Sequence, residues 1–240
     1  MITLSEVEQL KQDVVDSCQI LYKEHLWEWF GEGHPSARIP GTDKVIIPGH
    51  IHPYGRGMGG VKSVDDLIVI DTQMKKISGK YDSMNEAMVH VSAYKARPDI
   101  GGVVYSHPPH CDIFAELDRP IPWYGKEIPI WDSKGGIADE KRGKAFAKAL
   151  GKKEAILLRN PFSLVTTAPT LREAVLTVYM AENIARRQYK GLVIGKIPPA
   201  PDHEPLLKEW FTTYVEEYDT KFRHLDMWRF LHEKNIGPNS

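Results

Sequence analysis

The spacing of apolar side chains divides this chain into helical and extended segments. Over residues 4–30, apolar side chains such as Val7, Leu10 and Val14 recur every three or four positions, which predicts an amphipathic helix. Further along, Thr170 stands three positions before Glu173, a pairing typical of a helix start. Additional helices are predicted over residues 86–96, 112–117, 139–150, 170–189 and 203–234.

Short apolar and β-branched runs, bounded by Pro, Gly or Asp, indicate strands. These runs are residues 44–48, 67–71, 100–105, 155–158 and 163–167. Between the first two, residues 48–60 contain five glycines, which predicts a loop whose backbone can approach a ligand closely. Residues 119–136, rich in Pro, Trp and Gly, predict an irregular surface segment. This order of elements predicts one α/β domain over residues 1–200 and a helical extension over residues 201–240.

Composition narrows the setting in which the protein works. The 240 residues carry a net charge of -1, from 31 basic and 32 acidic side chains, which gives no electrostatic case for binding nucleic acid or an anionic membrane. No apolar run approaches the roughly 20 residues that span a bilayer, and the N-terminus does not resemble a signal peptide. Cys18 and Cys111 are far apart and predict two reduced thiols, so we expect a cytoplasmic protein.

Histidines are concentrated in the middle of the chain, and they are the strongest indication of chemistry. Six of the ten lie between residues 34 and 110. The predicted strand at residues 100–105 runs directly into His107 and His110, which are separated by two prolines. An imidazole at the end of a strand can serve as a metal ligand or as a general base. The sequence therefore predicts a site at the end of this strand.

Several motifs in this region resemble one family. Gly33–Arg38 is similar to its Gly-(Asn/His)-x-Ser-x-Arg turn, and Asp65–Asp71 is similar to one of its strands. Ser83–His90 looks like the segment that carries the family's catalytic glutamate, here Glu86. Tyr94–Val104 is close to the approach to its metal site. Over about residues 10–190, the chain thus resembles the class II aldolase/adducin family, which includes fuculose-phosphate-type aldolases, ribulose-phosphate epimerases and aromatic decarboxylases.

The resemblance implies a fold, a metal and an assembly. The implied fold is a single three-layer α/β domain, with a central mixed, mostly antiparallel sheet flanked by helices. In such enzymes, two histidines of a His-x-His motif and one of an Asn-His-Gly motif hold a divalent cation. Here the corresponding stretches read Tyr105–His107 and Asn160–Phe162, so only His107 of the three imidazoles remains. The usual three-histidine site cannot form from these residues. The family also implies a homotetramer or a higher homo-oligomer.

Three interpretations of this altered site remain open. In the first, a divalent metal (Zn, Mn or Fe) is held at a relocated site by His107 and His110, together with Glu86 or a histidine of the glycine-rich loop, foremost His52. In the second, Glu86 and His107 carry out acid–base chemistry without a metal, and Tyr105 donates a proton or a hydrogen bond. In the third, the chain is a non-catalytic member of the family.

From these interpretations we expect a lyase that acts on a small molecule. The favoured reaction is decarboxylation of a hydroxylated aromatic or heterocyclic carboxylic acid. The alternatives are an aldolase-type carbon–carbon lyase acting on a hydroxy-carbonyl substrate, a ferrous-iron oxygenase, and a ligand-binding protein with no chemistry. In the sugar-phosphate aldolases that the chain resembles, the region equivalent to the glycine-rich loop helps to hold the phosphate. Here that loop contains His-Ile-His, so a phosphorylated sugar is disfavoured as the substrate. The residues expected to bind the substrate are Ser36, Arg38, His50, His52 and Arg56.

Overall fold

The structure is a computed structural model that describes residues 3–27, 33–50, 57–195 and 220–237. A single eight-stranded sheet forms its centre, in the order β4-β3-β2-β1-β5-β10-β9-β8. Every neighbouring pair is antiparallel except β8 and β9, so the sheet is mixed and mostly antiparallel, as expected. Its strands are β1 (Gly33–Arg38), β2 (Lys44–Pro48), β3 (Leu67–Asp71), β4 (Lys76–Ser78), β5 (Gly102–Ser106), β8 (Ile130–Trp131), β9 (Ala155–Arg159) and β10 (Phe162–Ala168).

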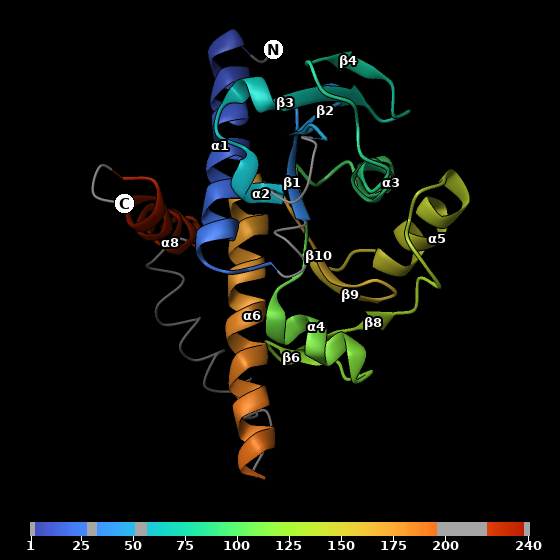
Figure 1. Ribbon diagram of the computed structural model, residues 1–240, viewed down its shortest axis with the longest axis vertical. Coiled ribbons are helices and arrows are strands. Elements are labelled where there is room, and N and C mark those ends of the chain that lie inside the picture. The colour runs from blue at the N-terminus through green and yellow to red at the C-terminus, as the bar shows by residue number, and fades with distance from the viewer. Residues whose placement is uncertain (1–2, 28–32, 51–56, 196–219, 238–240) are drawn as a thin grey trace.

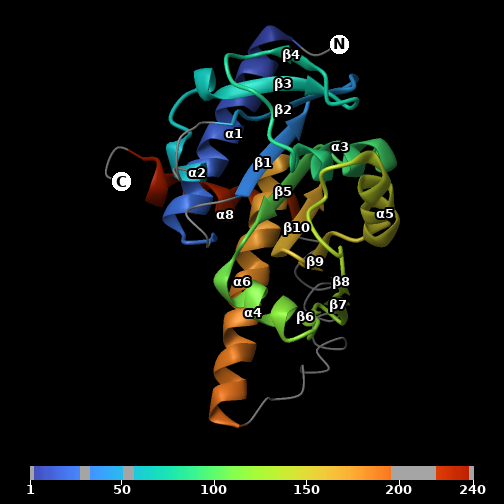
Figure 2. The ribbon, with the colours of Figure 1, turned by 45° about the vertical axis from the view of Figure 1, so that its right-hand side comes forward.

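Helices cover both faces of this sheet (Figures 1 and 2). On one face lie α1 (Leu4–Lys23) and α6 (Leu171–Ile194), and on the other lie α3 (Ala87–Ala96) and α5 (Glu140–Leu150). Alternate residues of each strand enter the two cores: Val104 packs on the α1 and α6 side, whereas Val103 and Tyr105 pack on the α3 and α5 side. The three-layer prediction is therefore confirmed.

The remaining elements are short or lie outside the layers. They are α2 (Gly57–Gly60), the 3-10 turn η1 (Val64–Asp66), α4 (Pro109–Glu116), α8 (Thr220–Asn235) and a separate two-stranded sheet of β6 (Ile121–Trp123) and β7 (Lys126–Ile128). Residues 119–136, expected to be irregular, thus contain β6, β7 and β8. The helix expected over residues 112–117 begins earlier, at Pro109, where proline is compatible with the first helical turn.

Side-chain caps fix where the long helices begin. Thr170 and Glu173 form the expected capping box before α6, and Asp139 accepts a hydrogen bond from the Arg142 backbone N–H at the start of α5. The first helix ends at Lys23, rather than near residue 30. Residues 28–30, the end of that predicted helix, lie outside the described part of the chain.

Gly33–Arg38, expected as a turn, is instead the central strand β1. Its sequence has few residues that favour strands, but it pairs with β2 on one side and β5 on the other, and this pairing overrides the local preference. Gly33 begins the strand with a φ of 131°, and a Cβ there would lie 2.9 Å from the carbonyl oxygen of Tyr105. This close approach, rather than a turn, accounts for the glycine.

The C-terminal helix α8 packs against α1. Trp228 and Leu231 are buried in the same core as α1 and α6, and His232 lies 2.9 Å from Asp16. Cys18 and Cys111 are buried free thiols, as expected. In the described ranges, no helix has both the length and the apolar character needed to cross a membrane.

Candidate active site

Pairing between β1 and β5 brings together two segments that the sequence singled out. In this register His34 lies opposite Tyr105, and Gly33 lies opposite Ser106. The strand β5 then leads into His107 and the first turn of α4. Across the face of the sheet, α3 presents His90 to the same strand β1. The site is therefore built where β1, β5, α3 and α4 meet.

Four buried side chains form a continuous hydrogen-bonded chain between β1 and α3, which we call the polar chain. His34 Nδ1 lies 2.7 Å from His90 Nε2, and His90 Nδ1 lies 2.6 Å from Ser36 Oγ. Ser36 Oγ in turn lies 3.0 Å from the Tyr94 hydroxyl, which donates to the backbone carbonyl of Ser36 at 2.9 Å. At most 5% of any of these four residues is exposed. The chain satisfies polar groups that would otherwise be costly to bury.

Burial keeps both imidazoles of the polar chain uncharged. It lowers the pKa of His34 to about 3, with a smaller contribution from His107. It also holds the pKa of His90 well below the usual value near 6.5, with His34 acting in the same direction. A charged imidazole would lose its hydration there and gain no anionic partner. At neutral pH, each ring therefore carries a single N–H.

Aromatic contacts connect the polar chain to His107. The rings of His34 and Tyr105 stack, with centroids 5.1 Å apart and an interplanar angle of 13°. Tyr105 meets His107 edge-on, at 5.2 Å and 85°. His107 is only 4% exposed, and its Nδ1 lies 3.3 Å from Asp112 Oδ2, within ion-pair distance but outside hydrogen-bonding geometry. A carboxylate beside Nδ1 favours a proton on that nitrogen and leaves Nε2 available as a base.

His110 points to a different partner, Glu182 of α6. Its Nδ1 lies 2.5 Å from Glu182 Oε1. The same carboxylate accepts hydrogen bonds from the backbone N–H groups of His110 and Cys111, so it caps α4 from another helix. Glu182 is 8% exposed, whereas the side chain of His110 remains partly exposed. His110 thus helps to fix the start of α4.

Glu86 lies at the N-cap of α3 and is exposed. Its side chain makes no hydrogen bond or ion pair with another described residue, and it does not cap the helix. It stands four positions before His90, which places the two on the same side of the helix, one turn apart. Glu86 therefore lies one helical turn beyond the polar chain, and no hydrogen bond or ion pair joins it to His107.

The other residues expected to bind the substrate have varied surroundings. Ser36 is fully buried within the polar chain. His50 is exposed, and its backbone N–H donates to the carbonyl of Asp82. His52 and Arg56 lie outside the described residues.

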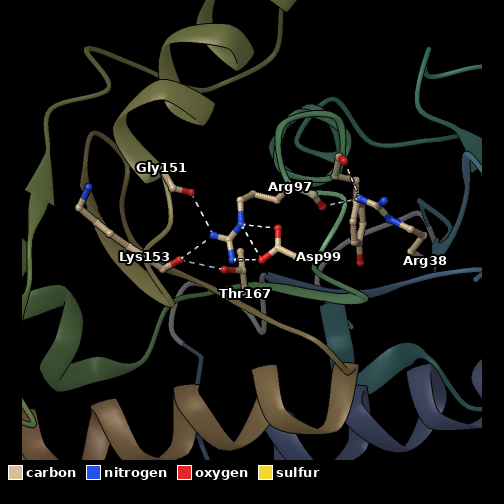
Figure 3. A network of polar contacts seen from close by, with 7 residues as sticks. Arg38, Arg97, Asp99, Gly151, Lys153 and Thr167 are labelled. Carbon is tan, nitrogen blue, oxygen red and sulfur yellow. Dashed lines mark hydrogen bonds and ion pairs between the residues drawn. The ribbon is translucent and has the colours of Figure 1, made fainter.

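Arg38 belongs to a network that ties β1 to the end of α3 (Figure 3). Its Nη2 donates to the backbone carbonyls of Tyr94 and Arg97, and its guanidinium lies over the Tyr94 ring at 4.8 Å. Next to it, Arg97 pairs with Asp99 and donates to the carbonyl of Gly151. These contacts hold α3, and with it His90, against the sheet.

The described residues do not provide a metal site. Nowhere in the described ranges do three His, Cys, Asp or Glu side chains come together in a way that could hold a metal ion. The expected set of His107, His110 and Glu86 is thus not assembled, because His107 faces Asp112 and His110 faces Glu182. A donor set of two separate His–carboxylate pairs does not fit the divalent cation that the family resemblance implies.

Fold and site together define an α/β sheet protein with a buried cluster of imidazole and tyrosine side chains where β1 and β5 meet. A family model for the class II aldolase and adducin N-terminal domain matches residues 12–189. The chain therefore belongs to the class II aldolase/adducin family.

Two curated relatives illustrate the range of the family. The chain is 31% identical over 119 residues to an L-ribulose-5-phosphate 4-epimerase of Salmonella typhi, a match that covers 50% of each sequence. It is 29% identical over 161 residues to a 5-methylthioribulose-1-phosphate/5-deoxyribulose-1-phosphate aldolase of Rhodospirillum rubrum, covering 62% of this chain and 71% of the relative. The match spans about half the length of the epimerase.

Solved structures agree on the fold. An L-fuculose 1-phosphate aldolase from Glaciozyma antarctica PI12 has a TM-score of 0.73 at 22% identity, over 98% of this chain and 94% of that one. An aldolase II superfamily protein from Pseudomonas syringae has a TM-score of 0.77 at 16% identity, over 100% and 98% of the two chains. At these identities, the likeness establishes the architecture.

Sequence reasoning missed two carboxylates. Asp112 follows His107 by five positions, and this short spacing was a local signal that could have suggested a His–Asp pair. Glu182 lies 72 positions after His110, and no local pattern indicates that contact. The motifs that contain His34 and His90 gave no sign that these two side chains join in one hydrogen-bonded chain.

Proposed function

We propose that this chain is a carbon–carbon lyase that decarboxylates a hydroxylated aromatic or heterocyclic carboxylic acid by acid–base chemistry. The observation that carries the proposal is the contact series from His34 through Tyr105 to His107 and Asp112. Three members of this series, His34, Tyr105 and His107, are flat rings, and a planar ligand can stack on such groups. His107 supplies an imidazole, a group that can serve as a general acid or a general base.

In the proposed step, His107 starts as an imidazolium beside Asp112 and delivers its Nε2 proton to the ring carbon that bears the carboxylate. The bond from that carbon to the carboxylate then breaks, CO2 leaves, and the electron pair restores the aromatic ring. Asp112 steadies the imidazolium, and His107 afterwards regains a proton from solvent. Buried surroundings favour the loss of charge as the carboxylate becomes CO2. Tyr105 donates a hydrogen bond to the ligand, and Glu86 is a second acid–base candidate at the exposed end of α3.

The test is an assay of CO2 release by the full-length protein, with a panel of hydroxylated aromatic acids in D2O. Release of CO2, with deuterium at the carbon that lost the carboxylate, supports the proposal. The protein is measured as purified and again after chelation, with metal content determined each time. If no acid in the panel releases CO2, or if activity appears only with a bound metal, this mechanism is wrong.

A second candidate is aldol cleavage of a hydroxy-carbonyl compound, which the similarity to the Rhodospirillum rubrum aldolase favours. Here His107 would protonate the enediolate carbon after the carbon–carbon bond breaks. The same protein is tested with hydroxy-carbonyl compounds, with and without a phosphate group. Formation of an aldehyde without CO2 from any acid would favour this candidate. For either reaction we propose a homotetramer, which light scattering can check.

A further inference from the structure

We infer that the polar chain fixes His34 in a single neutral tautomer and makes its Nε2 a hydrogen-bond acceptor for a hydroxyl group on the ligand. The inference deepens the proposed function, on which its ligand class rests. It assigns a specificity role to His34, a residue that sequence reasoning linked only to a turn. Each proton of the polar chain has one possible position, which follows from the contacts counted from its far end at Tyr94.

The Tyr94 hydroxyl lies at the end of the polar chain farthest from His34. The backbone carbonyl of Ser36 can only accept, and it lies 2.9 Å from the Tyr94 hydroxyl, so the single Tyr94 proton is used there. The 3.0 Å contact between the Tyr94 and Ser36 hydroxyls then requires the proton of Ser36. Ser36 has no second proton, so it must accept at its remaining contact.

That remaining contact determines which ring nitrogen carries the proton in each of the two histidines. Ser36 Oγ lies 2.6 Å from His90 Nδ1, which therefore carries the proton. A neutral His90 then has a bare Nε2, and the 2.7 Å contact to His34 Nδ1 needs a proton from His34. With its one proton on Nδ1, a neutral His34 has a lone pair on Nε2. If the hydrogen bonds between the side chains of the polar chain ran in the opposite direction, Tyr94 would donate its proton to Ser36 Oγ. The buried backbone carbonyl of Ser36 would then lose that proton.

The position of Nε2 suits ligand recognition. It makes no hydrogen bond to another described residue, and the ring that carries it stacks on Tyr105, next to His107. A lone pair there attracts a hydroxyl proton and repels the oxygens of a phosphate or carboxylate. Recognition by an acceptor that cannot become a donor rejects ligands lacking a hydroxyl, because the lone pair would lose its partner.

Nitrogen NMR of protein labelled with 15N in histidine tests the assignment, since the two neutral tautomers have distinct ring-nitrogen shifts. At pH 7 we expect His34 and His90 both to carry the proton on Nδ1. Tyr94→Phe frees the Ser36 proton to turn towards His90, so part of both signals should move to the Nε2–H form. Tyr179→Phe removes a hydroxyl from α6, outside the polar chain, and should leave both unchanged. An Nε2 proton on His34 in the unaltered protein would overturn the inference.

Ligand binding tests the role separately from any reaction. Catechol and its dimethyl ether are the probes, because they differ in donor hydroxyls and neither can lose CO2. We expect the protein to bind catechol at least about tenfold more tightly, and His34→Phe to reduce this preference to within about twofold. An unchanged preference in His34→Phe would overturn the inference even if decarboxylation is observed. Hydroxyl preference with no CO2 release would overturn only the proposed reaction.

Discussion

The buried cluster of imidazole and tyrosine side chains has an α3 side, with His34 and His90, and an α4 side, with His107. The two sides differ in how firmly the positions of their protons are fixed. On the α3 side, His34, His90 and Ser36 are joined by contacts of 2.6 to 2.7 Å, and each proton has one position. On the α4 side, His107 lies 3.3 Å from Asp112, outside hydrogen-bonding geometry. The first side suits recognition, because a fixed polarity selects partners. The second suits proton transfer, because its histidine is less constrained.

Lowering the pH should give the largest effect, because the buried histidines of the α3 side make the free energy of unfolding depend on pH. Unfolded histidine binds a proton as the pH falls below about 6.5, whereas folded His34 does so only near a pKa of about 3. The unfolded state therefore binds more protons in this window, and stability falls as the pH falls. A neutral histidine contributes a slope approaching about 1.4 kcal/mol per pH unit, or roughly 2 kcal/mol for His34 between pH 6.5 and 4.5, and His90, whose pKa is also lowered, adds to the loss in the same direction.

Urea unfolding at a series of pH values measures this effect. His90→Asn should flatten the slope by about one histidine, whatever stability it loses overall. His25→Asn alters an exposed histidine and should leave the slope as it was. Equal slopes in all three proteins would mean that the buried histidines are not the cause.

The α4 side should dominate the reaction rate. His107→Gln removes the proposed proton donor while keeping a side chain of similar size, and we expect CO2 release to fall by about 10²- to 10⁴-fold. His232→Gln is the matched control. His232 also pairs with an aspartate, Asp16, but it lies on α8 and not beside the site. Its rate should stay within about twofold of the unaltered protein. Comparable losses in both variants would point to stability rather than chemistry.

Breaking the α3 side should cost stability by a smaller amount. Ser36→Ala leaves His90 Nδ1 and the Tyr94 hydroxyl without their shared partner, so we expect a loss of about 1–3 kcal/mol in the free energy of unfolding. Ser78→Ala, on the exposed strand β4, should change it by less than about 0.5 kcal/mol. Thermal and urea unfolding report both values. A neutral Ser36→Ala would show that the hydroxyl is not needed to satisfy its neighbours.

The smallest expected effect concerns the support of α4. Glu182→Gln keeps the shape of the side chain but removes the charge that accepts from His110 and Cys111, so we expect a loss of about 1–2 kcal/mol. Glu116→Gln, at the exposed far end of α4, is the control and should be nearly neutral. Should the two variants unfold at the same urea concentration, the cap does not stabilise α4.

Periodicity predicted most of the fold because burial imposes it directly. The apolar spacing in α6 and the β-branched run of β3 both reflect which side chains enter the core. It failed at β1, where Gly33–Arg38 contains few strand-favouring residues and owes its conformation to the strands on either side. It also failed at β6, β7 and β8, which are only two or three residues long.

Parts of the site could be located from sequence, but not their connections. Tyr105 and His107 were singled out because they stand where the family has metal ligands, and they do lie in contact. The pairing of His34 with His90 depends on how α3 packs against β1, which no local pattern encodes. The contact of Glu182 with His110 joins two helices far apart in sequence, so it too required the structure.

The first turn of α4 has consequences for any anion that approaches His107. Helix starts often bind phosphate through free N–H groups and a partial positive charge. Here Pro108 and Pro109 have no N–H, and a protein carboxylate already takes those of the next two residues. The backbone of this turn therefore has no donor left to offer to a phosphate, and its positive end is already neutralised. The start of α4 therefore does not stabilise the charge of an acidic substrate beside His107, so it does not oppose the loss of that charge.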